Sequence, residues 1–265
     1  ESTVRLYNNA MKKLLAAMFV ALLMVGCDGT DRVGRELREG FSRKHNKGSA
    51  EKRRQAVLAE LNWAKRSNPT ELKLSSIGSI ADLTPLKGLT NLEVLAIKVS
   101  VSRAKKNRYT DLTPLAEFKN LEDLYIDCHY PGFNSLKPLA GLTKLKRLSL
   151  HQRHQPIPDL SPLKGLTNLR YLNLYENQNP DITALAGLTN LTELNLGRNK
   201  ITDLTPLTGL SQLTYLKLWE NHVTDLTPLT GLTKLRKLNL YGNPIPDDQK
   251  EMLKKALPNC KFGNF

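Results

Sequence analysis

Residues 191–207 read LTELNLGRNKITDLTPL, and residues 213–229 repeat the pattern as LTYLKLWENHVTDLTPL. The first half, L-x-x-L-x-L, alternates apolar and variable positions and predicts a short strand with one buried face. In the second half Thr205 precedes Pro206, which predicts a helical turn with Thr205 as its N-cap and proline in the first position. Each unit is therefore expected to form a strand, a turn, a short α- or 3₁₀-helical segment and a return.

The same unit recurs through most of the chain. Its leading residues are Leu92, Leu121, Leu145, Leu169, Leu191, Leu213 and Leu235, after a degenerate first copy around Leu72. One unit cannot bury its own leucines, whereas stacked units share a continuous core. The sequence therefore predicts an α/β solenoid of about eight repeats over residues 69–245, with parallel strands on its concave face.

This pattern resembles that of leucine-rich repeat proteins, in the 22-residue subclass found in internalins and in bacterial lipoproteins. The resemblance covers about residues 69–265 and implies a ladder of asparagine side chains that bond backbone groups after each strand. Its members here would be Asn177, Asn199, Asn221 and Asn243. His129 and Arg153 interrupt the ladder, and insertions in the second to fourth repeats make regular curvature doubtful there.

Both ends of a solenoid need a cover. In residues 49–68 the apolar side chains recur at helical spacing and predict an N-terminal capping helix. They are Val57, Leu58, Leu61 and Ala64. Residues 246–265 predict a C-terminal cap that contains a short amphipathic helix and a buried Cys260.

The N-terminal residues indicate an export signal. Residues 1–10 precede the first methionine and are interpreted as an upstream extension that is not native. Residues 11–26 have a basic start and a short apolar run, which predict a secretory signal peptide. Met24-Val25-Gly26-Cys27 resembles the lipobox of bacterial lipoproteins, and this resemblance implies that Cys27 is lipidated. An uncleaved signal anchor is the alternative.

Residues 27–48 are polar and charge-rich, and they predict a flexible basic tether. Such a stretch is attracted to anionic head groups, although a soluble spacer fits the composition equally well. The lipoprotein resemblance implies a cell-envelope protein anchored by lipid to a bacterial membrane. Asp28 directly after the cysteine favours the periplasmic side of the inner membrane.

Composition and motifs argue against several classes of protein. The chain is 40% hydrophobic, and its three cysteines are too few for a disulfide framework. No catalytic motif is found, so neither an enzyme nor a cofactor is expected. No metal is expected, because the weak candidate ligands surround Arg153 on a polar rim that reads as solvated. Those candidates are Cys128, His129, His151 and His154.

Aromatic side chains are predicted to gather on the concave face. Positions between the leucines point away from the core, and six of the ten Tyr and Trp residues occupy them. These are Tyr125, Tyr171, Tyr175, Tyr215, Trp219 and Tyr241. Exposed aromatic residues anchor interfaces, although strand propensity alone would also place them there. Apart from Tyr125, these residues form a compact patch, and none of the five is expected to contribute to the core.

Two functions remain open. In the first, the protein is a membrane-anchored monomer that binds a protein or peptide, and no nucleic acid, on its concave aromatic face. In the second, it binds envelope glycan or anionic lipid through aromatic and basic patches. The basic patch would be an insertion at residues 98–108, which contains five basic residues and no acidic one. They are Lys98, Arg103, Lys105, Lys106 and Arg108.

Overall fold

The computed structural model describes residues 50–74, 83–99, 110–128, 132–152, 156–157, 159–179 and 181–263. The predictions for the signal peptide, Cys27 and the tether lie outside the described residues. So do those for Arg103, Lys105, Lys106, Arg108, His129 and His154. The fold below is that of the unit Ala50–Phe265. In the part of the chain described, no helix has the length and apolarity needed to cross a membrane.

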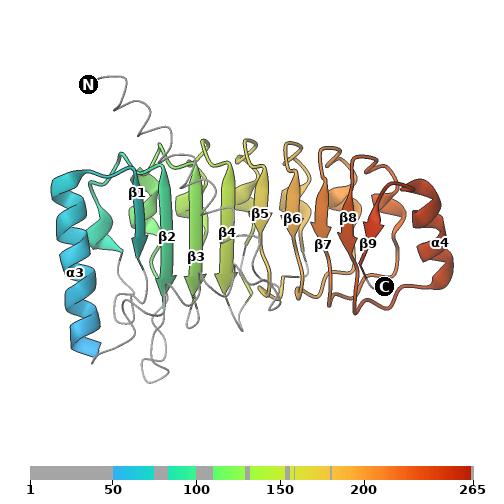
Figure 1. Ribbon diagram of the computed structural model, residues 1–265, viewed down its shortest axis with the longest axis horizontal. Helices are drawn as coiled ribbons and strands as arrows, with labels where there is room; N and C mark the ends of the chain where they lie inside the picture. Colours follow the sequence, from blue (N-terminus) through green and yellow to red (C-terminus); the bar gives the residue numbers. More distant parts are fainter. Residues whose placement is uncertain are drawn as a thin grey trace. The chain divides into compact units, whose positions relative to one another are not determined.

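A single parallel sheet of nine strands forms the unit, and each strand pairs with its neighbours in sequence (Figure 1). The strands are β1 (Glu71–Leu74), β2 (Val94–Val99), β3 (Asp123–Cys128), β4 (Arg147–Gln152), β5 (Tyr171–Asn173), β6 (Glu193–Asn195), β7 (Tyr215–Lys217), β8 (Lys237–Asn239) and β9 (Lys261–Phe262). The predicted solenoid of parallel strands is confirmed. Eight strands come from the predicted repeats, and β9 comes from the C-terminal cap.

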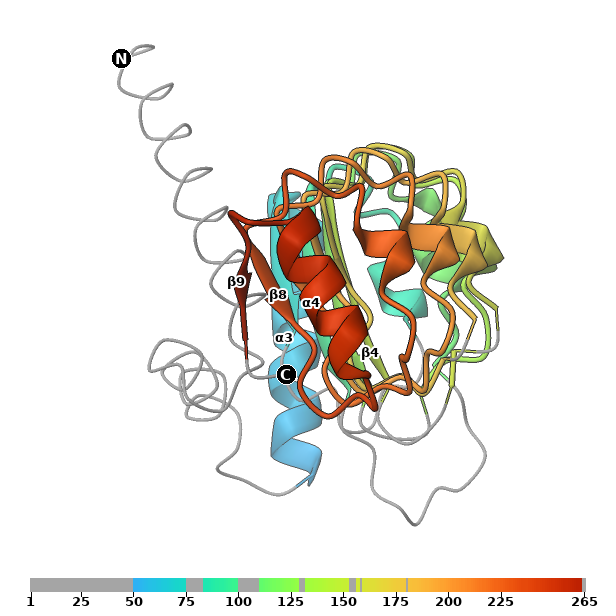
Figure 2. The ribbon, with the colours of Figure 1, turned by 90° about the vertical axis from the view of Figure 1, so that its right-hand side faces the viewer.

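Short 3₁₀ helices return the chain on the side opposite the sheet (Figure 2). They are η1 (Thr84–Leu86), η2 (Thr113–Glu117), η3 (Lys137–Leu139), η4 (Ser161–Leu163), η5 (Thr183–Leu185), η6 (Thr205–Leu207) and η7 (Thr227–Leu229). The prediction of Thr205 as an N-cap is wrong, because Thr205 is the first helical residue. Instead, Asp203 Oδ1 accepts the Thr205 backbone N–H at 2.8 Å.

This aspartate contact recurs at the start of most return turns. The same bond to the N–H two residues on is made by Asp111, Asp159, Asp181 and Asp225. Hydrogen bonds from the hydroxyl and the N–H of that Thr or Ser lower the pKa of each aspartate carboxyl. An exposed carboxylate therefore orients the entry to these five turns, a role that the sequence pattern assigns to threonine.

The core is built from leucines that align across the strands. Leu194, Leu216 and Leu238 are partners in the register and at most 3% exposed. Leu185, Leu207 and Leu229 of the 3₁₀ helices are fully buried and belong to the same cluster. Each repeat therefore shares its apolar side chains with the repeats before and after it.

A helix closes each end of the stack (Figure 1). In α3 (Ala50–Ser67) Val57, Leu61 and Ala64 are buried and join the common core, while Leu58 is half-buried. In α4 (Asp247–Ala256) Leu253 is buried. Cys260 follows α4 and is buried, as predicted, and its burial raises the pKa of its thiol to about 11.

The predicted asparagine ladder is confirmed. Asn221 Oδ1 accepts the backbone N–H groups of Asn199 and Ile201 at 3.0–3.1 Å. Its Nδ2 donates to the carbonyls of Leu196 and Leu218 at 2.8–2.9 Å. Asn177, Asn199 and Asn243 make equivalent bonds. The ladder thus satisfies buried backbone groups that neighbouring strands leave unpaired.

Gln152 bonds backbone groups next to the position where Arg153 replaces an asparagine of the ladder. Gln152 Oε1 accepts the Phe133 N–H at 2.6 Å, and its Nε2 donates to the Pro156 carbonyl at 3.0 Å. The Gln152 side chain lies directly against Gly132, where a Cβ would come within 2.4 Å of Oε1. Glycine at position 132 therefore makes room for the substitute amide.

We predict that Asn221→Ala lowers the free energy of unfolding by about 3 kcal/mol or more. The variant leaves several buried backbone groups without a partner, each at a cost of about 1–3 kcal/mol. Asn190→Ala is the matched control, because Asn190 is exposed and makes one bond to the Thr167 carbonyl. Urea unfolding of both variants checks the prediction, and equal losses would contradict it.

Candidate binding surface

Outward positions of the strands, and of the residues that follow β5 to β8, form three rows on one surface, which we call the sheet face. Row one contains Glu71, Val94, Asp123, Arg147, Tyr171, Glu193, Tyr215, Lys237 and Lys261. Row two contains Lys73, Ala96, Tyr125, Ser149, Asn173, Asn195, Lys217 and Asn239. Row three contains Lys98, Asp127, His151, Tyr175, Gly197, Trp219 and Tyr241.

The register places all six predicted aromatic residues on the sheet face, but their exposure differs. Tyr241 is 54% exposed, whereas Tyr175 is only 9% exposed. Tyr125, Tyr171, Tyr215 and Trp219 are half-buried. The expectation that none of them contributes to packing is therefore wrong for Tyr175, which neighbouring side chains of the sheet face cover.

Trp219 reaches Tyr175 across an intervening strand. The two ring centroids lie 5.3 Å apart with an interplanar angle of 27°, although the residues are two strand spacings, about 9–10 Å, apart in the sheet. Gly197 makes this possible, because a Cβ at that position would lie 2.5 Å from Trp219 Nε1. The indole therefore fills the slot that glycine leaves in row three.

Sequence reasoning missed the role of Gly197. A signal was available, because row three reads Tyr175, Gly197, Trp219, Tyr241 in four successive repeats. A glycine among three aromatic residues marks a place where another group approaches the backbone closely.

An ion-pair ladder borders the aromatic residues. Glu176, Arg198 and Glu220 each follow a row-three residue, and each has a left-handed backbone with φ between 50° and 57°. Arg198 Nε lies 2.6 Å from Glu220 Oε2, and Nη1 lies 3.8 Å from Glu176 Oε1. The bond to Glu220 raises the pKa of the Arg198 guanidinium.

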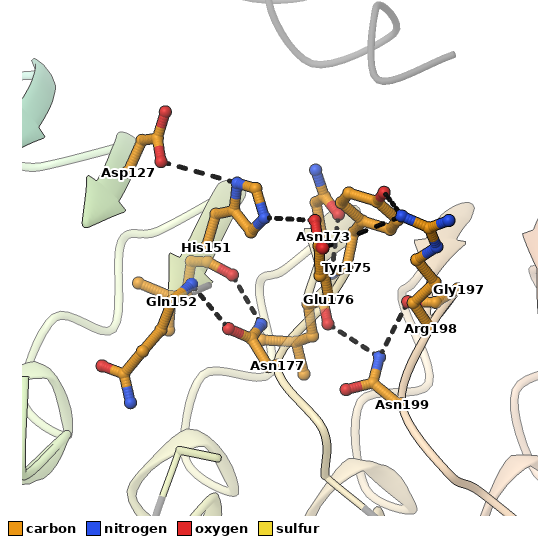
Figure 3. Close-up of polar contacts among 12 residues, drawn as sticks. Asp127, His151, Gln152, Asn173, Tyr175, Glu176, Asn177, Gly197, Arg198 and Asn199 are labelled. Atoms are coloured by element: carbon orange, nitrogen blue, oxygen red, sulfur yellow. Dashed lines mark hydrogen bonds and ion pairs between the residues drawn. The ribbon is translucent and has the colours of Figure 1, made fainter. Parts of the chain in front are cut away.

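Arg198 also touches the aromatic pair itself. Its Cζ lies 5.2 Å from the Trp219 ring centroid, within the range of a cation–π interaction. Its Nη1 lies 3.4 Å from the Tyr175 hydroxyl (Figure 3). The guanidinium therefore links both rings to the acidic residues beside them.

His151 extends row three toward the N-terminal repeats. Its ring centroid lies 5.3 Å from that of Tyr175. Figure 3 shows the imidazole between two carboxylates, with Nδ1 3.5 Å from Asp127 Oδ1 and Nε2 3.3 Å from Glu176 Oε2. Lys98, predicted as an anion ligand, lies 3.7 Å from Asp127 Oδ2 and is neutralised by it.

Of the suggested metal ligands, the two that the structure describes, Cys128 and His151, lie on opposite sides of the sheet. Cys128 is 1% exposed and points into the core, whereas His151 lies on the sheet face. Burial raises the pKa of the Cys128 thiol to about 12, which disfavours the thiolate that binds metals. Among the residues that the structure describes, no three His, Cys, Asp or Glu side chains form a candidate metal site.

Comparison with known proteins agrees with this architecture. The family model "Leucine Rich repeats (2 copies)" matches residues 167–209 and 211–254. An internalin (inlF) of Listeria monocytogenes is similar at 27% identity and a TM-score of 0.60, over 85% of this chain and 67% of that one. Internalin C2 of the same species is 35% identical with a TM-score of 0.50, over 58% of this chain and 64% of that one.

A leucine-rich repeat protein of Leptospira interrogans is 26% identical with a TM-score of 0.55, over 68% of this chain. This chain spans about two thirds of each internalin and half of the Leptospira protein. A sequence search of curated proteins gave no match. The unit Ala50–Phe265 is thus a leucine-rich repeat solenoid with internalin-like structural neighbours.

We predict that Gly197→Ala displaces the Trp219 indole from Tyr175, because the new methyl group would occupy its place. With Trp63→Phe as background, Trp219 is the only tryptophan, so its fluorescence emission should shift to the red. Gly187→Ala is the matched control, since nothing lies within 4 Å of a Cβ there. Unchanged emission in the Gly197 variant would show that the stack does not depend on the glycine.

Proposed function

We propose that this protein is an interaction module that holds a protein or peptide segment on its sheet face. The observation that carries the proposal is the ordered stack of Tyr175 and Trp219, with exposed Tyr241 as the next residue of row three. Interfaces concentrate their binding energy in a few aromatic and arginine residues. Solenoids present extended surfaces of this kind to their partners.

The aromatic pair is preorganised, which favours binding. Gly197 provides the slot and Arg198 holds both rings, so little side-chain freedom remains to be lost when a partner binds. Each immobilised side chain otherwise costs about 0.5–1.5 kcal/mol. A partner that packs on Trp219 and Tyr241 would meet an ordered surface.

The placement of Trp219 also carries a cost to folding. Its Nε1 is buried and has no hydrogen-bond partner among the described residues. An unsatisfied buried donor costs about 1–3 kcal/mol. A side chain that is unfavourable in this respect and lies on the outer face of the sheet is more readily explained by binding than by stability.

We also propose that the protein is tethered to a membrane by lipid on Cys27. The support is the sequence pattern of residues 11–27, with a basic start, a short apolar run and a small residue before the cysteine. The predicted tether, residues 27–48, would link the lipid to the N-terminal capping helix, and by the resemblance to bacterial lipoproteins Asp28 favours the periplasmic side of the inner membrane. In this arrangement the sheet face would capture partners within the cell envelope.

A double variant of the sheet face tests the binding proposal. Trp219→Ala/Tyr241→Ala should stay folded by circular dichroism, yet bind its partner at least tenfold more weakly, because anchors cost about 2 kcal/mol or more each. Tyr175 is left intact because it is buried. Full-length chain is immobilised, and proteins captured from envelope extract are quantified by mass spectrometry.

Trp63→Ala is the control for this experiment, since Trp63 is 50% exposed on α3 rather than on the sheet face. Proteins captured equally by all three baits would refute binding through the aromatic residues. If the bait instead retains purified lipopolysaccharide or peptidoglycan, and only the double variant loses it, the glycan alternative is correct.

Lipid attachment has a separate test. Cys27→Ser should abolish labelling by an alkyne fatty-acid probe and release the protein from the membrane fraction, because the acyl chains supply the anchoring energy. Cys260→Ser is the control and should keep the label. Labelling that persists in the Cys27 variant would contradict lipidation at this residue.

A further inference from the structure

Charge is distributed unevenly along the sheet face. In strands β1 to β4 the outward acidic residues of rows one and three are paired with basic neighbours. The pairs are Lys73–Glu71, Lys98–Asp127 and Arg147–Asp123. The Arg147 pair is bidentate, with Nε 2.8 Å from Asp123 Oδ1. This half of the face is therefore neutralised within the protein.

The other half of the face carries an excess of positive charge. In strands β7 to β9, rows one and two contain Lys217, Lys237 and Lys261, and no acidic residue occupies these rows. Lys237 and Lys261 are exposed and adjacent in the register. Over the part of the chain described, no carboxylate forms an ion pair with either of them, whereas Lys73, Lys98 and Arg147 are all paired.

An aromatic ring holds two of these ammonium groups in place. The Nζ atoms of Lys217 and Lys237 lie 5.3 and 5.9 Å from the Tyr215 ring centroid. Lys217 is only 5% exposed, so its side chain is fixed against the sheet. We call Tyr215, Lys217, Lys237 and Lys261 the lysine corner. It spans three strands, or about 10 Å.

We propose that the lysine corner binds an acidic segment of the partner protein, one with two or three carboxylates close together. The inference rests on the proposed function and specifies the chemistry of its partner. Lys237 and Lys261 are the exposed lysines of the corner, and exposed lysines on a binding face select partners of opposite charge. Tyr215 within the corner, and the exposed Tyr241 in row three of the same sheet face, offer surface for the apolar atoms of the segment.

The surroundings of the corner favour a peptide over a membrane surface. Glu193 precedes Tyr215 in row one, and Glu220 lies beside Trp219. A bilayer of anionic lipid presents negative charge over a wide area and would meet both glutamates. A short acidic segment can contact the lysines without approaching Glu193 or Glu220.

The test uses the full chain and a defined probe, fluorescein-labelled Gly-Glu-Tyr-Glu-Glu-Gly, with binding followed by fluorescence anisotropy at low ionic strength. Lys237→Glu/Lys261→Glu should weaken binding about tenfold or more, because two attractive contacts become repulsive. Lys234→Glu/Lys255→Glu makes the same change in net charge at exposed lysines outside the sheet face, and should weaken binding less than about twofold. The peptide with Gln in place of Glu should bind none of the three proteins measurably.

Two outcomes would overturn the inference. Equal weakening in both double variants would mean that the probe responds only to net charge. Binding to phosphatidylglycerol vesicles, lost in Lys237→Glu/Lys261→Glu while the peptide does not bind, would assign the corner to lipid.

The same variant separates this inference from the proposed function. One possible result is that envelope proteins that need Trp219 and Tyr241 for capture still bind Lys237→Glu/Lys261→Glu normally. That result would refute the proposal that the partner carries an acidic segment, and the proposal that the sheet face binds a protein would be retained. If the aromatic double variant also captures them normally, both proposals fail.

Discussion

The fold depends on one constraint, which is that no repeat can bury its own leucines. Leu194, Leu216 and Leu238 are enclosed only because the repeats on either side supply the opposing surface. The same constraint applies to the backbone, since Asn221 bonds a carbonyl of its own repeat and carbonyl and N–H groups of the preceding one. Stability is therefore shared between neighbours, and the two ends need α3 and α4 as covers.

Because the core is confined to the inner side of the strands, the outer side is free to vary. The repeats use this freedom differently in the two halves of the sheet. In the N-terminal half, outward charges satisfy one another in pairs such as Arg147–Asp123. In the C-terminal half, rings and lysines gather around Trp219 and Tyr215. The same repeated scaffold therefore presents paired charges at one end of the sheet face and aromatic rings with lysines at the other.

Local backbone geometry links the scaffold to this surface. The residue after each row-three position is left-handed in four successive repeats, at Glu176, Arg198, Glu220 and Gly242. Each non-glycine residue in that conformation costs about 1–2 kcal/mol. At three of the four positions the side chain joins the ion-pair ladder beside the aromatic residues, so the strained turns also organise the edge of the binding surface.

The sequence by itself determined the repeat, the parallel strands and the face on which each aromatic residue lies, because these follow from periodicity and phase. The asparagine ladder was implied by the resemblance of the repeat to those of leucine-rich repeat proteins. Only the tertiary structure decided which side chains touch. Row-three phase puts Tyr175 and Trp219 two strands apart, yet their rings stack, because Gly197 leaves a gap that no periodic pattern describes. Likewise, Asp203 rather than Thr205 makes the hydrogen bond at the start of the turn. Lys98 forms an ion pair with Asp127, whereas Lys237 forms none with the described residues. The ring stack and the ion pairs depend on distances between side chains of different repeats, and the aspartate contact depends on the backbone conformation at the start of the turn; spacing along the chain specifies neither.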